Sequence, residues 1–271
     1  MEVKRGIRRN FARRVASYDQ HAAAQRFMAR RLLALAAAAA PRPGRILEVG
    51  CGTGHLTARL RREHPGAGLT ALDLAPALVA AARERLGPNE GVAWVVADAE
   101  TWSRGAFDLI ISNAAFQWLT SPGEALAAYF QCLNPGGVLA FSTLGPLTFR
   151  ELSASLREAE ARLGARRVPE IPAQKFLTRE GWAALLGAAG FSQVSLERRL
   201  ITAAYPTVRQ FLKSLQATGA TNPDPRPFSS RLLKAMTAAY EEGFRHNGAV
   251  PVTYEIIWAV ARRQGRKKVP I

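Results

Sequence analysis

Short apolar segments and helical patterns alternate along the chain between residues 45 and 145. Five of these segments read as buried strands: RILEV, GLTALD, VAWVVAD, FDLIISN and VLAFSTLG. Helical patterns follow the first, second and fourth of them. Strands that alternate with helices favour a parallel sheet covered by helices on both faces. The alternation therefore predicts an α/β fold.

The rest of the chain adds helices and two more strands to this core. A sixth strand is expected at SQVSLERRLITAAY, and a last strand includes VTYEIIWAVARR. We expect one domain over residues 1–271 with a seven-stranded, mostly parallel sheet. Its parts are an N-terminal helical lid (1–40), a core (41–148), helices with the sixth strand (149–204), a helical cap inserted over the carboxyl edge of the sheet (205–250) and the last strand (251–263).

Size and composition argue against several classes of protein. The 271 residues, 48% of them hydrophobic, suffice for one core. No window holds the ~20 apolar residues that a membrane span needs. The two cysteines, Cys51 and Cys132, offer neither a disulfide framework nor zinc-ligand spacing. We therefore expect a cytoplasmic protein that binds no metal and acts away from membranes.

The chain carries a strong positive charge. Its 37 Lys and Arg residues exceed its 21 Asp and Glu residues, and the formal net charge is +16. Only six of the basic residues are Lys, so a codon bias toward Ala and Arg explains the charge as well as an anionic partner does. The basic residues are scattered rather than gathered in a stripe, and we do not expect nucleic-acid binding.

The segment ILEVGCGTG carries the strongest functional signal. Gly50, Gly52 and Gly54 lie between a strand and a helix, where glycines let the backbone turn tightly and approach a ligand closely. Asp73 ends the next strand, and a carboxylate there can accept both hydroxyls of a ribose. Glu48 lies on the strand before the turn. A buried acid at that place repels phosphates and suits a cationic ligand.

This turn resembles the first motif of the class I S-adenosylmethionine-dependent methyltransferases, and the element spacing agrees over residues 40–145. The resemblance implies a Rossmann-like methyltransferase sheet with S-adenosylmethionine as the cofactor. It also implies that the glycines pass close to the cofactor, that Asp73 holds the ribose and that Asp98 lies near the adenine. Leu74 and Ala99, which follow these acids, would lie close to the ring.

The segment SNAAFQWL places two amides among aromatic residues at the end of the fourth strand. Ligands of open α/β sheets bind outside the carboxyl ends of the strands, so this segment should line the place where the methyl group leaves. Asn113 could hydrogen-bond the amino-acid part of the cofactor through its side-chain carbonyl oxygen or its backbone, and Gln117 could point at the acceptor. Phe116 and Trp118 would exclude water or fill the core.

Four segments resemble the malonyl-acyl-carrier-protein O-methyltransferases of biotin synthesis: SNAAFQWL, NFARRVASYDQHAAAQRFMARRLL, FLKSLQATGATNP and PVTYEIIWAVARR. Together they extend the resemblance over nearly the whole chain. It implies methylation of the free carboxylate of a malonyl thioester, carried by an acidic acyl carrier protein or by coenzyme A. A carboxylate has a reference pKa of ~4 and needs no general base. The chain fits this chemistry, because no convincing His/Asp or Cys/His pair lies near the strand ends.

Two further residues are candidates for catalysis. Tyr18, in the N-terminal helices, is expected to close the site and orient the methyl donor or acceptor. Lys213 is the first candidate for holding the carboxylate or the thioester arm of the acceptor, and Arg150 and Arg209 follow. The alternatives are that Tyr18 packs in the core and that Lys213 is a solvated surface residue. An Arg-rich rim would speed the encounter with an acidic carrier protein, and we expect a monomer.

Two other functions stay open. The first is methylation of another small carboxylate or of a quinone-like ring. The cofactor half of the sequence does not separate these acceptors, although a carbon or phenol acceptor would want a base. The second is a module that binds the cofactor without catalysis, as a sensor or an RNA-associated protein.

Overall fold

The structure is a computed structural model that describes residues 2–88, 91–164, 171–218 and 229–264. The contacts within the chain divide it into two compact units. Unit 1 contains Met1–His21, Leu144–Thr178 and Arg199–Ile256. Unit 2 contains Ala22–Thr143, Arg179–Arg198 and Ile257–Ile271. The end of the FLKSLQATGATNP segment and most of the basic C-terminal cluster RRQGRKK lie outside the described residues.

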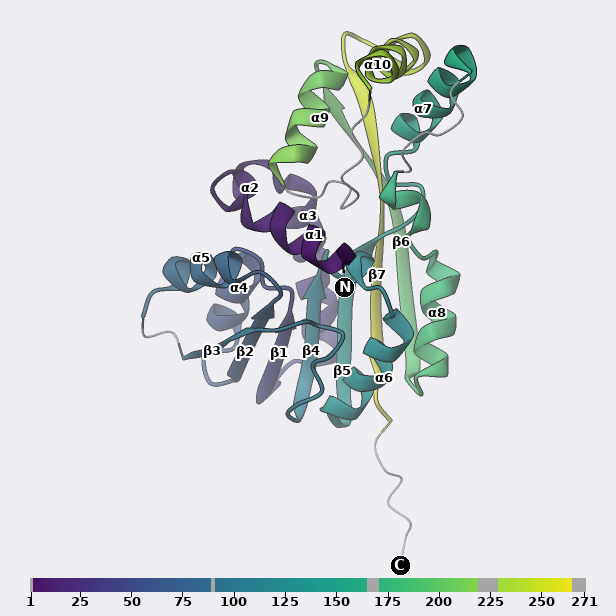
Figure 1. Ribbon diagram of the computed structural model, residues 1–271. Helices are drawn as coiled ribbons and strands as arrows, with labels where there is room; N and C mark the ends of the chain where they lie inside the picture. Colours follow the sequence, from purple (N-terminus) through teal and green to yellow (C-terminus); the bar gives the residue numbers. More distant parts are fainter. Residues whose placement is uncertain (1, 89–90, 165–170, 219–228, 265–271) are drawn as a thin grey trace, which may run out of the picture. The chain divides into compact units, whose positions relative to one another are not determined.

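Seven strands form one sheet in the order β3-β2-β1-β4-β5-β7-β6 (Figure 1). β1 pairs in parallel with β2 and β4, β2 with β3, and β4 with β5. Backbone hydrogen bonds join Gly136 to Arg263 and Gly145 to Glu255, so β7 runs antiparallel to β5. The predicted seven-stranded, mostly parallel sheet is confirmed. The strands are β1 Arg45–Val49, β2 Gly68–Asp73, β3 Val92–Val96, β4 Phe107–Asn113, β5 Leu133–Leu144, β6 Ser192–Tyr205 and β7 Val250–Arg262.

One strand is longer than the sequence predicts. The helical pattern after the fourth predicted strand ends in Pro-Gly-Gly, a sequence that predicts a turn before VLAFSTLG, but β5 already begins at Leu133 and includes these residues. The pairing of β5 with β4 changes register between Phe107 and Leu109. Gly136 lies in the extra stretch of β5 with a φ of +85°, which a glycine adopts without a steric penalty. The expected turn is therefore an irregularity inside a strand.

The helices occupy the segments between and around these strands. Short 3₁₀ helices cover Phe116–Trp118 and Pro172–Lys175. The α-helices are α1 Glu2–Ala12, α2 Val15–His21, α3 Ala23–Ala39, α4 His55–Glu63, α5 Pro76–Leu86, α6 Pro122–Cys132, α7 Arg150–Leu163, α8 Arg179–Ala188, α9 Val208–Ala217 and α10 Ser230–Phe244.

The N-terminal helical region is broken although its sequence contains no glycine or proline between residues 15 and 39. α2 ends at His21, and Ala22 leaves the helical conformation with a ψ of +35° before α3 begins. The partners of the two helices explain the break. The Ser17 hydroxyl of α2 donates to the Ala217 carbonyl of α9 at 2.9 Å in unit 1. α3 is held instead in unit 2, so tertiary contacts override the uniform helix propensity.

Aromatic residues fill the core of unit 2. The ring of Phe116 stacks on that of Phe141 on β5, with 4.6 Å between the ring centroids. Trp182 on α8 completes the cluster at 5.0 Å from Phe141, and all three side chains are buried. The indole nitrogen of Trp258 on β7 donates to the Met28 carbonyl of α3 at 2.9 Å. This cluster and this bond attach α8 and α3 to the sheet.

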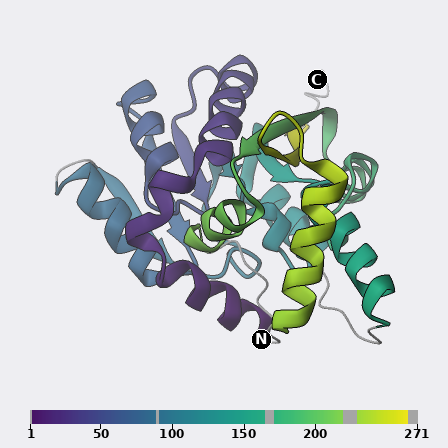
Figure 2. The same ribbon diagram turned by 90° about the horizontal axis from the view of Figure 1, so that it is seen from above.

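Unit 1 has a core of its own. α7 and α10 lie side by side, as both ribbon views show (Figures 1 and 2). Phe149, Phe211 and Tyr240 belong to one buried cluster between these helices, α9 and β7. The ring of Phe149 lies 5.4 Å from that of Phe211. Aromatic burial of this kind supplies much of the stabilisation of a small unit.

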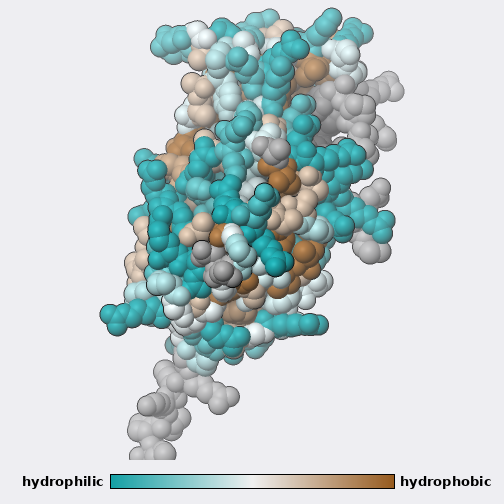
Figure 3. All heavy atoms as spheres, turned by 90° about the vertical axis from the view of Figure 1, so that its left-hand side faces the viewer, coloured by the Kyte–Doolittle hydropathy of each residue, from teal (hydrophilic) through white to brown (hydrophobic). Residues whose placement is uncertain are grey.

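Hydrophilic residues cover most of the surface that Figure 3 presents, with smaller hydrophobic areas between them. Within the described ranges, no helix has the length and apolar character to cross a membrane.

Candidate functional site

The carboxyl ends of four parallel strands bring the predicted cofactor residues to one edge of unit 2. Val49 lies opposite Leu72, and Asp73 opposite Val96, so β1, β2 and β3 end at nearly the same level. Asn113 ends β4 beside Ser142. The structure therefore gathers ten of the twelve predicted site residues in unit 2: Glu48, Gly50, Gly52, Gly54, Asp73, Leu74, Asp98, Ala99, Asn113 and Gln117.

The glycine turn has the backbone conformation that the sequence suggests. Gly50, Gly52 and Gly54 have φ values of +75°, +55° and +81°, in the left-handed region that disfavours other residues. A Cβ on Gly50 would lie 2.6 Å from the Cβ of Ala115, so the turn lies directly against the SNAAFQWL segment. A Cβ on Gly52 would meet no described atom within 4 Å. The turn thus packs on one side and leaves open space on the other.

Glu48 is a buried acid without a hydrogen bond. Only 1% of its surface is exposed, and neither carboxyl oxygen has a hydrogen-bond partner among the described residues. Burial raises the pKa of Glu48 to about 8, the nearby Thr57 hydroxyl opposes the shift without reaching hydrogen-bond geometry, and Asp73 adds to it. An unpaired buried carboxyl group is costly unless a ligand compensates it. This site therefore fits a cationic ligand such as the predicted cofactor.

The Asp73 carboxylate holds the backbone at the end of β2. Its Oδ2 accepts from the Gly52 N–H at 3.0 Å, and its Oδ1 accepts from the Ala75 N–H at 2.9 Å. Burial raises the pKa of Asp73, and these two bonds, with a third from the Leu74 N–H, oppose the shift. The carboxylate thus fixes the glycine turn, and the three bonds occupy three of its roughly four lone-pair sites.

The segment after β3 forms a compact loop. The Asp98 Oδ1 accepts from the Glu100 N–H at 3.0 Å, which turns the carboxylate back over its own backbone. The Ala99 carbonyl accepts from the Tyr129 hydroxyl at 2.6 Å. Leu74, after Asp73, is partly buried like Asp98 and Ala99.

The side chain of Asn113 already has two partners. Its Oδ1 accepts from the Ser142 hydroxyl at 2.7 Å, and its Nδ2 donates to the Gln25 carbonyl of α3 at 3.1 Å. Of the two modes of cofactor contact that the sequence suggests, the one through the backbone agrees better with this arrangement. Ala114, the next residue, has a φ of +53°. A non-glycine residue in this conformation stores strain of the kind found at functional sites.

Gln117 and its aromatic neighbours differ in their environments. The Gln117 Nε2 donates to the Ala114 carbonyl at 2.7 Å, and its Oε1 accepts from the Thr143 hydroxyl at 3.2 Å. The amide is therefore held in one orientation. Phe116 is buried and fills the core, which is one of the two roles expected for it. Trp118 is only partly buried.

The remaining two predicted residues belong to unit 1. Tyr18 lies partly buried on α2, with its ring 6.3 Å from that of Phe11, and Lys213 is exposed on α9. The two helices pack against each other. Arg209 on α9 is exposed as well.

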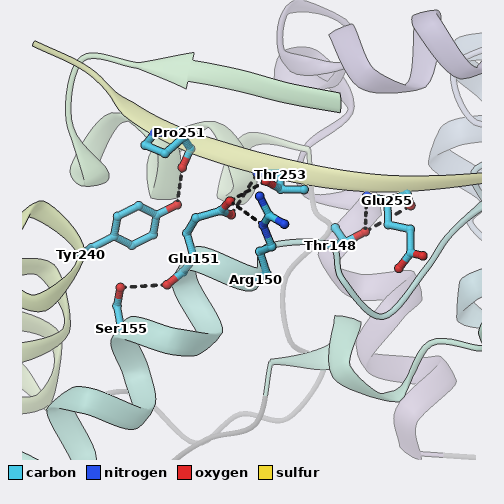
Figure 4. Close-up of polar contacts among 8 residues, drawn as sticks. All are labelled: Thr148, Arg150, Glu151, Ser155, Tyr240, Pro251, Thr253 and Glu255. Carbon is cyan, nitrogen blue, oxygen red and sulfur yellow. Dashed lines mark hydrogen bonds and ion pairs between the residues drawn. The ribbon is translucent and has the colours of Figure 1, made fainter. Parts of the chain in front are cut away.

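Unit 1 also holds a buried polar network (Figure 4). The Glu151 carboxylate accepts from the Thr253 N–H at 3.0 Å and from the Thr253 hydroxyl, which lies closer still. The Arg150 Nε donates to the same carboxylate at 3.1 Å, while its side chain is 55% exposed. The Tyr240 hydroxyl donates to the Pro251 carbonyl at 2.7 Å. Arg150 is therefore anchored at one nitrogen and open to solvent elsewhere.

Several residues that contact the predicted site carry no signal in the sequence. Ala115 touches the glycine turn, and Ser142 orients Asn113. Glu100 attaches the loop after β3 to the start of α6, and Tyr129 binds the same loop from α6. Each acts through a partner far away in the chain. Within the described part of the chain, no three His, Cys, Asp or Glu side chains are grouped so that they could hold a metal ion.

Known proteins share this arrangement. The family described as "Methyltransferase domain" matches residues 18–196. The malonyl-[acyl-carrier protein] O-methyltransferase of Geobacter sulfurreducens is 37% identical over 269 residues, covering 96% of this chain and 99% of that protein. The YcgJ protein of Bacillus subtilis has a TM-score of 0.61 at 14% identity and covers 87% of this chain and 99% of its own. The N-methyltransferase NodS of Bradyrhizobium japonicum, solved with S-adenosyl-L-homocysteine, has a TM-score of 0.53 at 16% identity, over 95% and 98% of the two chains.

At 14% and 16% identity, the solved structures show that the fold is shared. The relative from Geobacter sulfurreducens is similar over almost its entire length, including the segments outside the strands that carry the glycine turn. The chain therefore belongs to the malonyl-[acyl-carrier protein] O-methyltransferase family and contains its methyltransferase domain.

Proposed function

We propose that this protein transfers a methyl group from S-adenosylmethionine to the free carboxylate of malonyl-acyl-carrier protein, the step that starts biotin synthesis. The observation that carries the proposal is the similarity to a curated malonyl-[acyl-carrier protein] O-methyltransferase across 96% of the chain. This similarity includes α9 and α10, which do not contribute to the glycine turn. Two buried free cysteines suit a reducing compartment, and we place the enzyme in the cytoplasm.

The edge of unit 2 has residues that suit each part of the cofactor. When bound, S-adenosylmethionine supplies a methyl group on a positively charged sulfur. We assign the compensation of positive charge to Glu48, because it is a buried acid that makes no hydrogen bond to the described residues. Asp73 accepts the ribose hydroxyls, and Asp98, Leu74 and Ala99 surround the adenine. The backbone of Asn113 and the three glycines contact the amino-acid part.

At the acceptor, the main task of the protein is to position the carboxylate relative to the methyl group. A malonyl carboxylate is ionised near neutrality, so the protein does not have to remove a proton. Its task is to hold an acceptor oxygen in line with the methyl group, at ~3–3.5 Å, and to exclude water. Gln117 suits this task because both ends of its amide are already fixed by Ala114 and Thr143.

We assign two residues of unit 1 to the acceptor side. Tyr18 orients the methyl donor or the acceptor, and Lys213 holds the acceptor carboxylate or the thioester arm, with Arg150 and Arg209 as further candidates. Lys213→Met should raise the KM for the malonyl thioester. Lys234→Met is the matched control, because Lys234 is an exposed lysine on the neighbouring α10. An unchanged KM in Lys213→Met would remove that residue from the site, and full activity with unchanged cofactor affinity in Tyr18→Phe would remove Tyr18.

The net charge of +16 suits an acidic carrier protein. Surface charge of opposite sign speeds the encounter of two proteins and is screened by salt. The value of kcat/KM for malonyl-acyl-carrier protein should therefore fall with ionic strength more steeply than the value for a small malonyl thioester. Equal salt profiles for the two substrates would count against a role of the basic surface in docking.

The direct test uses S-adenosylmethionine labelled in the methyl group. The protein is incubated separately with malonyl-acyl-carrier protein, malonyl-coenzyme A and free malonate, and the label is followed into a methyl ester. We expect the fastest labelling of malonyl-acyl-carrier protein. Labelling of a different small carboxylate or of a quinone-like compound, with none of the malonyl thioesters, would replace the proposed substrate. Binding of the cofactor without any transfer would favour a non-catalytic module.

A further inference from the structure

The loop after β3 is attached to the start of α6 by a carboxylate. The Glu100 side chain accepts from the Thr120 hydroxyl at 2.8 Å, from the Ser121 N–H at 2.9 Å and from the Thr120 N–H, which lies closer still. These residues directly precede α6, and the hydroxyl of Ser121 makes no capping bond of its own. Glu100 therefore supplies the negative charge that a helix N-terminus favours, although it comes from another segment of the chain.

A second bond attaches the same loop to the middle of α6. Tyr129 is fully buried, and its hydroxyl donates to the Ala99 carbonyl at 2.6 Å. Its ring stacks on Phe116 at 5.8 Å and 16°, which fixes the direction of the hydroxyl. Burial raises the pKa of Tyr129, with Asp98 and Glu100 adding to the shift, so the hydroxyl stays protonated and remains a donor. We call the Glu100 and Tyr129 contacts together the α6 clamp.

The α6 clamp determines where the Asp98 carboxylate points. The Asp98 Oδ1 accepts from the backbone N–H of Glu100, while the side chain of Glu100 is held at α6. Ala99 lies between these two residues, and Tyr129 holds its carbonyl. A shift of the loop would therefore move both residues that we assign to the adenine.

We propose that Glu100 and Tyr129 are positioning residues that hold the loop after β3 so that Asp98 and Ala99 recognise the adenine of the cofactor. This inference rests on the proposed function, because it assigns a role within the same cofactor site. Neither residue needs to touch the cofactor. Asp98 accepts from the exocyclic amine of adenine, whereas hypoxanthine presents a carbonyl oxygen at that position and would face the carboxylate unfavourably.

The opposite edge of the sheet in unit 2 offers a matched control. Asp108, near the start of β4, accepts from the N–H groups of Gly44 and Arg45 at 2.9 Å each, and from Asn134 at 2.7 Å. Like Glu100, it is a partly exposed carboxylate that holds the backbone of another segment. Asp108→Asn should lower the melting temperature much as Glu100→Gln does, without affecting nucleoside recognition.

The experiment measures selectivity by calorimetry. Full-length wild type, Glu100→Gln, Tyr129→Phe and Asp108→Asn are titrated with S-adenosylhomocysteine and with S-inosylhomocysteine, its hypoxanthine analogue. We expect the wild type and Asp108→Asn to prefer the adenine compound equally. The preference is the ratio of the dissociation constants for the hypoxanthine and adenine compounds. This ratio should fall about 3- to 10-fold in Tyr129→Phe and about 10-fold or more in Glu100→Gln. 5′-Methylthioadenosine lacks the amino-acid part of the cofactor. In each variant its affinity should fall by the same factor as the affinity for S-adenosylhomocysteine.

The outcomes separate this inference from the proposed function. Variants that melt at lower temperature but keep the wild-type selectivity would overturn the positioning role and leave the proposed function intact. A folded wild type that binds no S-adenosylhomocysteine would overturn the proposed function and this inference with it. If Glu100→Gln fails to fold, the selectivity of Tyr129→Phe decides, because that change removes only one hydroxyl.

Discussion

Glu48 should make cofactor binding depend on pH. Burial raises the pKa of its carboxyl group to about 8 in the free protein, and no described residue gives the carboxyl group a hydrogen bond. A cationic ligand favours the ionised form, so binding lowers this pKa and releases a proton. If the pKa returns to its ordinary value of about 4.3 in the complex, the affinity for S-adenosylmethionine should rise roughly 25-fold between pH 6.0 and 7.5, because a raised pKa costs 1.36 kcal/mol for each unit of pH below it.

Isothermal titration calorimetry measures both parts of this prediction. The dissociation constant is determined at several pH values, and the proton release is obtained from buffers with different ionisation enthalpies. S-Adenosylhomocysteine, which lacks the charge on sulfur, should show a weaker pH dependence. Glu48→Gln keeps the size of the side chain and removes the titration, so its affinity should be lower at pH 7.5 and nearly constant over the range. A flat profile in the wild type, or an equal slope in Glu48→Gln, would refute the reasoning.

The same group predicts the pH dependence of stability in the absence of ligand. The folded pKa of Glu48, about 8, lies above the ordinary value of about 4.3, so the folded state binds more protons between these limits. The free energy of unfolding should therefore decrease as the pH rises from about 4 to 8, by up to about 5 kcal/mol. Glu48→Gln should lose this contribution to the slope in denaturant titrations, whereas equal slopes in both proteins would assign the dependence to other groups.

Two further predictions concern the backbone and the polar network. Gly50→Ala should lower the free energy of unfolding by about 1–3 kcal/mol, because of the positive φ and the 2.6 Å approach to Ala115. Ala115→Gly removes the Cβ that the new side chain at residue 50 would meet, so the double variant should regain in thermal denaturation only the stability lost to that steric contact. A double variant as stable as the wild type would show that the positive φ of residue 50 costs no free energy. Thr253→Val removes the hydroxyl that donates to the buried Glu151 and should cost about 1–3 kcal/mol in urea titrations. An unchanged urea midpoint would mean that this bond contributes nothing.

Much of the sheet and the cofactor edge could be predicted because each feature depends on nearby residues. The β2 segment GLTALD is an apolar run that ends in Asp73, and the structure has a strand with these bounds. The glycine turn is also a local feature, since it depends on the positive φ of Gly50, Gly52 and Gly54. The position of Asp73 at the end of its strand then follows from strand length and from parallel pairing.

The features that the sequence does not predict depend on distant partners. The helical region predicted for residues 1–40 is broken at Ala22, because α2 and α3 are held by different partners. The helical pattern expected up to the Pro-Gly-Gly turn gives way to an extended β5, which pairs with β4. Glu100 could not be distinguished from a surface acid, because Thr120 and Ser121 lie 20 and 21 residues away. The spacing of apolar residues predicts local helices and strands, whereas these features depend on contacts between residues far apart in the sequence.

The polar groups at the carboxyl edge of unit 2 are of two kinds, those held by hydrogen bonds and the buried acid Glu48. The proposed chemistry explains this difference. Asn113, Gln117 and Asp73 are all held by hydrogen bonds before any ligand binds. Fixed groups of this kind reduce the reorganisation needed to align a donor and an acceptor. Glu48 differs, since its carboxyl oxygens have no hydrogen-bond partner in the part of the chain that the structure describes. A carboxylate acceptor needs no proton transfer, so the site can dispense with a titrating base. Glu48, whose pKa burial raises to about 8, can then respond to the charge of the cofactor.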